Sequence, residues 1–366
     1  MGPESGLWKC PSKTTAKLEI LRAYVGAWFS ILASRGFKHV FYIDGFCGPG
    51  EYLDGEEGSP IIATRIANST AQKYPGFSAT LFFVDTDSTA LNHLRSNDAI
   101  KNHHSLIDIN IRHGAFLDEA DEIVRHISTK PNSPVFSFVD PFGFSQSPFA
   151  KVRELMRNRS SEVVVNLMCG FMNRFKEHKD EQVTVQISRM VGEDDLSEIV
   201  MAEDSIATIC DVYERNLKSI GSYTLKFMMR DEKNIRDNAI FFCGKHPRGF
   251  EKIKEAMWKV DPIHGNSFSA HADHESLQSD FFASQPQTHR LSDLLFAHYA
   301  GQKRVPVSEL FRWVKEETDT FLPKHARIEL EDLLSKGVIT EVVDPDKPGR
   351  KRRKNTWPER LLVSFR

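Results

Sequence analysis

The sequence is poor in cysteine and contains no long apolar run. Its 366 residues include five cysteines, and no two of them form a C-x-x-C pair. Because disulfide-rich secreted folds and structural zinc sites need closely spaced cysteines, neither class is expected, and no metal site is predicted. No apolar stretch approaches the roughly 20 residues of a transmembrane helix, and the first residues lack the apolar core of a signal peptide. We expect a cytoplasmic protein with reduced thiols and no membrane association.

An excess of charge of one sign is also missing. The 48 Lys and Arg residues nearly balance the 50 Asp and Glu residues, which gives a formal net charge of -2. Since the chain is not a polycation, any contact with a nucleic acid must be local. An apolar content of 40% is ordinary for a globular protein, and 366 residues favour two domains over one.

Alternating strand and helix patterns occupy the first half of the chain. Apolar runs that predict strands span 39–45, 79–85, 107–114, 134–140 and 161–168. Amphipathic patterns that predict helices span 13–36, 60–74, 88–97, 117–128 and 149–158. Such alternation is typical of an α/β protein in which helices cover both faces of a parallel sheet.

The alternation ends in a predicted antiparallel hairpin. A mostly polar stretch over about 175–220 favours a helical insertion, and strands are predicted over 223–230 and 238–244. A mostly parallel sheet that ends with one reversed strand is the layout of class I methyltransferases, whose fold is Rossmann-like. We therefore predict a domain of this fold over 1–276, with the insertion as a possible substrate region.

A second unit is predicted over 277–366. Helical patterns span 290–301, 306–317 and 322–337, and strands are expected over 338–344 and 360–365. Three helices followed by a two-stranded wing describe a winged-helix domain.

The first motif lies between 44 and 50. Asp44, Gly45, Phe46, Gly48 and Gly50 follow the pattern D-x-F-x-G-x-G, which differs from the G-x-G-x-x-G of dinucleotide-binding turns. Glycines let the backbone approach a ligand, and a carboxylate at the strand end attracts a cation. The motif indicates a site for S-adenosylmethionine, which carries an ammonium and a sulfonium and no phosphate; a purely structural tight turn is the alternative.

Acidic residues also end the next strand. Asp85 is placed to accept hydrogen bonds from ribose hydroxyls, whereas Asp87 is placed to cap the following helix. After the third strand, adenine contacts fall to backbone groups of Ala115 and Phe116, or to Asp118, for which a capping role is favoured.

The fourth strand ends with an acid, a proline and aromatic residues. Hydrogen bonds from an exocyclic amine to Asp140 and the Pro141 carbonyl would direct its lone pair toward a methyl donor, and Phe142 or Phe144 would stack on an extruded base. These four residues are the predicted catalytic group. The alternative is a structural turn whose acid caps a helix or orients the cofactor.

A basic run marks the predicted wing over 350–354. It consists of Arg350, Lys351, Arg352, Arg353 and Lys354. Together with Lys324 and Arg327 of the predicted third helix, these residues are candidates for phosphate contacts in a nucleic acid. A solvated loop or a protein-docking surface would explain the same charges.

Taken together, the strings DGFCGPG and DPFG and the terminal helices make the chain resemble the three-Cys-motif partner protein (TcmP) family. The resemblance runs over nearly the whole length. It implies a methyltransferase-like domain joined to a winged helix, and a companion protein that carries three cysteines. Lys13 and Lys17 belong to a helix that can close over a cofactor, although solvated lysines are favoured there.

These motifs favour an S-adenosylmethionine-dependent methyltransferase that acts on an exocyclic amine of a nucleic-acid base. The alternative is a non-catalytic module that binds the cofactor or docks the companion, with a winged helix that binds DNA, RNA or that protein.

Overall fold

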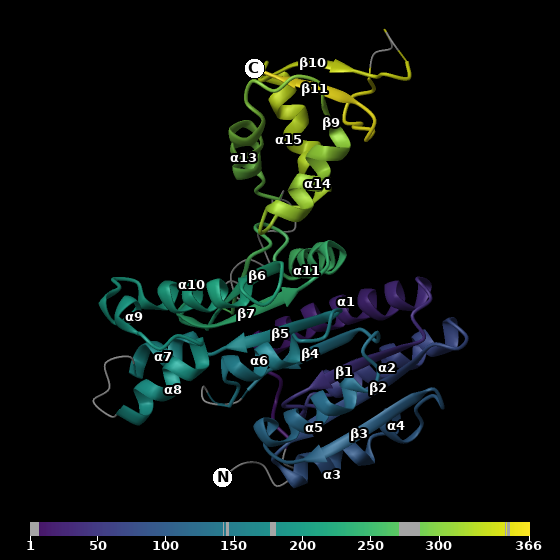
Figure 1. Ribbon diagram of the computed structural model, residues 1–366, viewed down its shortest axis with the longest axis vertical. Coiled ribbons are helices and arrows are strands. Elements are labelled where there is room, and N and C mark those ends of the chain that lie inside the picture. The colour runs from purple at the N-terminus through teal and green to yellow at the C-terminus, as the bar shows by residue number, and fades with distance from the viewer. Residues whose placement is uncertain are drawn as a thin grey trace.

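The structure of the chain, a computed structural model, describes residues 7–141, 143, 146–175, 181–270, 286–347, 349 and 352–366. Two groups of elements are visible in it (Figure 1). The larger group contains a mixed sheet flanked by helices, and the smaller group, near the C-terminus, contains three helices and a small sheet. The predicted boundary between 276 and 277 lies outside the described residues.

An eight-stranded sheet forms the centre of the larger group, in the order β3-β2-β1-β4-β5-β7-β6-β8. Its strands are β1 (His39–Asp44), β2 (Ser78–Asp85), β3 (Ile107–His113), β4 (Val135–Val139), β5 (Ser161–Leu167), β6 (Tyr223–Arg230), β7 (Arg236–Gly244) and β8 (Ser267–Ser269). The pairs from β3 to β5 are parallel, whereas β7 runs antiparallel to both of its neighbours. The prediction of a mostly parallel α/β sheet with one reversed strand is confirmed. The short strand β8, parallel to β6, was not predicted.

Helices cover both faces of this sheet. One face carries α1 (Ser12–Ser34), α2 (Ser59–Lys73), α3 (Ser88–Ser96), α4 (Asp98–Lys101) and α11 (Pro247–Val260). The other carries α5 (Phe116–Ser128), α6 (Phe149–Leu155), α7 (Cys169–Phe175), α8 (Glu181–Val191), α9 (Ser197–Met201) and α10 (Ser205–Lys218). In β1, Val40 and Tyr42 pack on the first face, and Phe41 and Ile43 pack on the second. Because both faces of β1 are covered by helices, its four central residues, 40–43, are all apolar.

The C-terminal group contains α13 (His289–Tyr299), α14 (Val307–Glu317) and α15 (Pro323–Ser335). Its strands are β9 (Val305–Pro306), β10 (Ile339–Val343) and β11 (Leu362–Phe365), in the antiparallel order β10-β11-β9. The three predicted helices and the two predicted long strands are all observed, and they share one apolar core.

Two buried side chains of α11 attach this group to the sheet domain. Lys254 donates three hydrogen bonds to the carbonyls of Val314, Lys315 and Thr318, at 3.3, 2.8 and 2.9 Å, where α14 ends. Because an ammonium has three donors and helix ends leave carbonyls unpaired, this contact is fully matched. The Trp258 indole donates to the carbonyl of Thr320 at 2.8 Å.

Within the described ranges, no helix is long and apolar enough to cross a bilayer. All five cysteines are buried and free.

Candidate functional site

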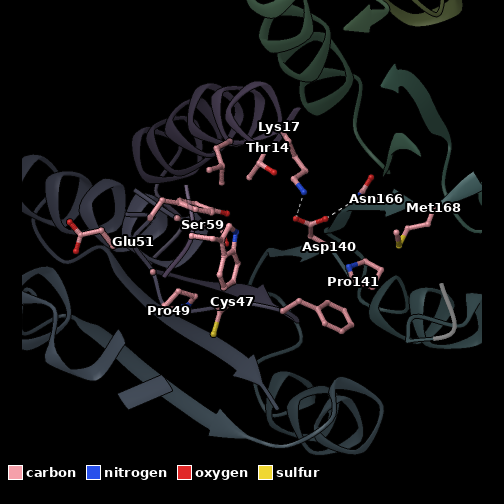
Figure 2. Close-up of a pocket in the computed structure, with 17 residues that line it drawn as sticks. Thr14, Lys17, Cys47, Pro49, Glu51, Ser59, Asp140, Pro141, Asn166 and Met168 are labelled. Atoms are coloured by element: carbon pink, nitrogen blue, oxygen red, sulfur yellow. Dashed lines mark hydrogen bonds and ion pairs between the residues drawn. The ribbon is translucent and has the colours of Figure 1, made fainter. Parts of the chain in front are cut away.

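A cavity of about 200 Å³ lies where β1 and β4 end, at the point where the strand order of the sheet reverses. Ligands of open α/β sheets bind at this kind of switch point. Figure 2 shows the lining residues, which come from the N-terminal segment, α1, the glycine turn, α2 and the ends of β4 and β5. They include Trp8, Thr14, Lys17, Phe46, Cys47, Gly48, Gly50, Glu51, Tyr52, Gly58, Ser59, Asp140, Pro141, Asn166 and Met168.

The glycine turn after β1 needs glycine at two of its positions. Gly48 and Gly50 have φ values of +59° and +85°, in the left-handed region that side chains disfavour. A Cβ on Gly50 would lie 2.7 Å from Leu94 Cδ1, so a side chain would also clash there. The turn therefore brings its backbone against α2 and α3 and leaves its outer side open to the cavity.

Asp85, at the end of β2, fixes the glycine turn through a hydrogen bond to its backbone. Its Oδ2 accepts a hydrogen bond from the Gly48 N–H at 2.8 Å, and its Oδ1 accepts one from the Asp87 N–H at 2.9 Å. Its exposed fraction is 8%. Asp87 accepts hydrogen bonds from the N–H groups of Thr89 and Ala90, which confirms the predicted helix cap.

Asp44, the last residue of β1, lies fully buried beneath the lining of the cavity. Its Oδ1 accepts a hydrogen bond from the Phe46 N–H at 3.3 Å, whereas its Oδ2 has no hydrogen-bond partner among the described residues. Burial raises the pKa of Asp44 to about 7, while Ser59 and the Phe46 N–H oppose the rise and the nearby carboxylates of Asp140 and Asp85 add to it. A cation in the cavity would favour the ionised form and offset this burial.

Asp140 follows β4 and enters the cavity beside Lys17 of α1 (Figure 2). Its Oδ2 forms an ion pair with the Lys17 ammonium, and its Oδ1 accepts a hydrogen bond from the Asn166 amide at 2.8 Å. Asn166 in turn accepts a hydrogen bond from Asn238 of β7. The carboxylate orientation is thus fixed from three elements, because α1, β5 and β7 all contribute.

The preference for solvated lysines on α1 is wrong. The Lys17 side chain is 12% exposed and paired with Asp140, and Lys13 pairs with Asp237 at 2.6 Å. Both lysines connect α1 to the cavity end of the sheet, because their partners lie after β4 and in β7. The apolar periodicity of α1 shows on which face of the helix a lysine lies. It does not show which carboxylate lies opposite that face in the fold.

Pro141 lines the cavity next to Asp140. The other two members of the predicted catalytic group, Phe142 and Phe144, lie outside the described residues.

The predicted adenine-contact region is packed with side chains. Phe46 and Phe116 lie with their ring centroids 5.4 Å apart, and a Cβ on Gly45 would lie 2.8 Å from Phe116. Phe116 is 2% exposed, and Ala115 is the residue before the first turn of α5. Of these residues only Phe46 lines the cavity. The preferred capping role of Asp118 is wrong, because α5 begins after Ala115 with no side-chain cap and Asp118 lies inside its first turn.

Several lining residues were missed in the sequence. Trp8 and Tyr52 meet edge to face at 6.1 Å and close one side of the cavity. Ser59 begins α2, and Asn166 follows three valines in strand β5. The polar Asn166 within a run of valines was a visible signal, whereas nothing in the sequence joins Trp8 to Tyr52.

The basic candidates of the C-terminal group lie in two places. Lys324 and Arg327 of α15 line a groove of about 670 Å³ between α11, α14 and α15. The Arg327 guanidinium lies 4.7 Å from the centre of the Phe311 ring. Six basic side chains line this groove, against three acidic ones: Arg248, Lys259, Arg312, Lys315, Lys324 and Arg327 against Glu251, Glu255 and Glu359.

The predicted basic wing is only partly available for a ligand. Arg352 forms an ion pair with Glu331 at 2.8 Å and lies over the Trp357 ring at 4.1 Å, so its side chain is 12% exposed. Arg353 and Lys354 are exposed. Arg350 and Lys351 lie outside the described residues.

No protein-family model and no curated protein sequence matches the chain. Among solved structures, it is similar to an O-methyltransferase from Bacillus cereus in complex with SAH, with 15% identity and a TM-score of 0.33 over 64% of this chain and 84% of that one. It is also similar to a DUF574 family protein from Streptomyces avermitilis, with 12% identity and a TM-score of 0.33 over 62% and 83% of the two chains. At these values the chemistry of the cavity has to be derived from its own residues.

Proposed function

We propose that the chain is an S-adenosylmethionine-dependent methyltransferase. The observation that carries this proposal is the cavity at the switch point, where a glycine turn held by Asp85 covers a buried carboxylate, Asp44, with an unpaired oxygen. A cationic ligand fits this arrangement, because it would offset the burial of Asp44 and needs no phosphate-binding helix terminus.

The same residues would hold the cofactor. Gly48 and Gly50 leave space for close backbone contact, Asp44 supplies negative charge, and Asp85 keeps the turn in place and has lone pairs left for ribose hydroxyls. The cavity of about 200 Å³ is below the roughly 300–1,000 Å³ of most small-ligand sites, so we expect lining side chains such as Trp8 to move outward on binding.

When bound, this cofactor supplies a methyl group activated by a sulfonium. The chain itself contributes orientation. Asp140, held by Lys17 and Asn166, and the Pro141 carbonyl would accept N–H hydrogen bonds from an exocyclic amine and direct its lone pair into the cavity. Positioning of this kind accounts for up to about 7–11 kcal/mol of a barrier, so no strong base is required.

The substrate class that we infer is a nucleic-acid base. The groove between α11 and the C-terminal helices is rich in basic side chains, and the exposed Arg353 and Lys354 add charge at the wing of what we take to be a winged-helix domain. Phosphate contacts release counterions, so binding should weaken steeply with salt. Replacement of Lys324 by Ala should reduce the slope of log K against log salt by about 1, whereas Lys73→Ala on α2 should leave it unchanged.

Asp140→Ala is the decisive test of catalysis. We expect the variant to lose methyl transfer and to keep cofactor binding, as measured with radiolabelled cofactor and total RNA or DNA and by calorimetry. Mass spectrometry of nucleosides from cells with and without the gene would identify the modified base. Transfer that persists in the variant would contradict the assignment of Asp140.

A non-catalytic binding module is the second candidate. Three features favour it: the packing of Phe46 on Phe116, the small cavity, and the ion pair that already engages Asp140. In that case the cavity senses the cofactor, and the C-terminal group binds DNA, RNA or a companion protein with a three-cysteine motif. Cofactor binding without any modified nucleoside, together with co-purification of such a companion, would favour this function.

A further inference from the structure

A second cavity lies at the opposite ends of the central strands. It measures about 380 Å³ and is formed where β4 and β5 begin and β7 ends, between α1 and α11. Figure 1 shows these two helices on the same side of the sheet. Because the first cavity lies where β1 and β4 end, the two are separated by the length of the strands.

The floor of this second cavity is a buried carboxyl group. Glu162 of β5 accepts a hydrogen bond from the Tyr24 hydroxyl at 2.6 Å. Gly249, in the first turn of α11, makes room for it, since a Cβ there would lie 2.1 Å from Glu162 Oε1. Glycine is a poor helix former. The first turn of α11 thus contains a residue that disfavours the helix and leaves space for this carboxyl group.

Burial raises the pKa of Glu162 to about 7, although hydrogen bonds from Tyr24 and Trp28 oppose the rise. No basic side chain pairs with Glu162 among the described residues. A carboxyl group of this kind has acceptor sites left for the N–H groups of a ligand.

The walls are apolar and the rim is basic. Trp28, Ile31, Leu32, Phe37 and Pro134 form the walls. Five basic side chains line the cavity: Arg35, Arg159, Lys245, Arg248 and Lys252.

Two of these five are free to bind an anion. Arg35 and Arg159 are exposed and have no side-chain hydrogen bond or ion pair with any described residue, whereas Arg248 and Lys252 pair with acids of α11 at 2.6 Å. The N-terminus of α11 lies at the same rim and adds positive potential.

We propose that this cavity binds a nucleobase that carries a phosphate, with the base between the apolar walls, its N–H groups on Glu162 and the phosphate on Arg35 and Arg159. The apolar walls fit a flat apolar body, the carboxyl group at the floor fits hydrogen-bond donors, and the basic rim fits an anion. A nucleotide carries all three. A free nucleotide and a nucleotide of a single-stranded nucleic acid share this chemistry. The site is distinct from the proposed cofactor site, because it shares no lining residue with the first cavity.

The test is calorimetric titration of the full chain with the 5′-monophosphates of adenosine, cytidine, guanosine and uridine. Saturating S-adenosylhomocysteine is present, so that adenosine groups do not enter the first cavity. Ribose 5-phosphate, inorganic phosphate and a single-stranded ten-nucleotide DNA are the other probes. Arg159→Ala is compared with Arg157→Ala, an exposed arginine two residues away that does not line the cavity.

We expect saturable binding of at least one nucleotide, weakened at least about tenfold by Arg159→Ala, which removes a charged hydrogen-bond donor to the phosphate, and unchanged by Arg157→Ala. Glu162→Gln should change the order of the four affinities at pH 8, because the amide presents N–H donors where the ionised carboxylate presents only acceptors. Tighter binding of the ten-nucleotide DNA than of any monophosphate would show that the bound nucleotide belongs to a single-stranded nucleic acid. No saturable binding, equal binding of ribose 5-phosphate, or equal effects of the two arginine variants would overturn the proposal.

Discussion

Glu162→Gln should change how the stability of the protein depends on pH. The wild-type carboxyl group has a pKa of about 7 in the folded protein, against an ordinary value of 4.5 for glutamate. Because the folded state favours the protonated form, the contribution of Glu162 to stability is complete below pH 4.5 and is lost as pH rises through 7. A shift of this size corresponds to about 3 kcal/mol, of which about 2.5 kcal/mol falls between pH 5 and 8.

The glutamine variant keeps an oxygen that can accept from the Tyr24 hydroxyl, but it has no proton to lose. Relative to wild type, we expect its free energy of unfolding to rise by about 2.5 kcal/mol between pH 5 and pH 8. Urea denaturation followed by circular dichroism at four pH values measures this difference. Glu255→Gln, a partly exposed carboxylate on α11, is the matched control and should show no such trend. A difference between wild type and Glu162→Gln that is constant across this range would refute the reasoning.

Three further predictions concern the cofactor turn and the attachment of the C-terminal group. The pKa of Asp44 is about 7, so the carboxylate that would attract the cationic cofactor is mostly protonated at pH 5. Affinity for S-adenosylmethionine, measured by calorimetry, should therefore rise up to about 50-fold from pH 5 to 7 in wild type and stay constant in Asp44→Asn. Equal pH profiles would contradict a role for this carboxylate. Gly50→Ala places a methyl group at φ +85° and against Leu94, so it should lower the free energy of unfolding by about 1–3 kcal/mol, as measured by urea denaturation. An unchanged denaturation midpoint would contradict this expectation. Lys254→Met removes the ammonium that donates to the carbonyls of Val314, Lys315 and Thr318, so it should lower the free energy of unfolding by about 3 kcal/mol and speed proteolysis after α11. Lys259→Met, on the exposed side of that helix, should do neither; similar digestion of both variants would argue against the attachment.

The order of the elements follows from local sequence patterns, and the relation of the side chains at the site does not. The strand over 39–45 is visible as a continuous apolar run, because helices bury both of its faces, and the hairpin over 223–244 is visible as two short apolar runs. The cap role of Asp87 is visible because a cap depends on the next few residues only.

Contacts across the fold leave no such local pattern. The ion pair between Lys17 and Asp140 joins residues more than a hundred positions apart, so it depends on how α1 crosses the sheet. The same limit applies to Arg352, whose guanidinium forms an ion pair with Glu331 and lies over the Trp357 ring within the C-terminal group. A run of basic residues in the sequence shows where positive charge is concentrated, but not which acidic or aromatic side chains contact it.

The helix α1 spans both ends of the sheet. Lys17 lies at one cavity and Tyr24 at the other, seven residues or about 10 Å further along the same helix. The strand β5 repeats this arrangement, with Asn166 at the first cavity and Glu162 at the second. A helix moves as a rod, so a tilt that widens one chamber also displaces the wall of the other. Occupancy of either chamber should therefore alter the affinity of its counterpart, by the same factor in both directions.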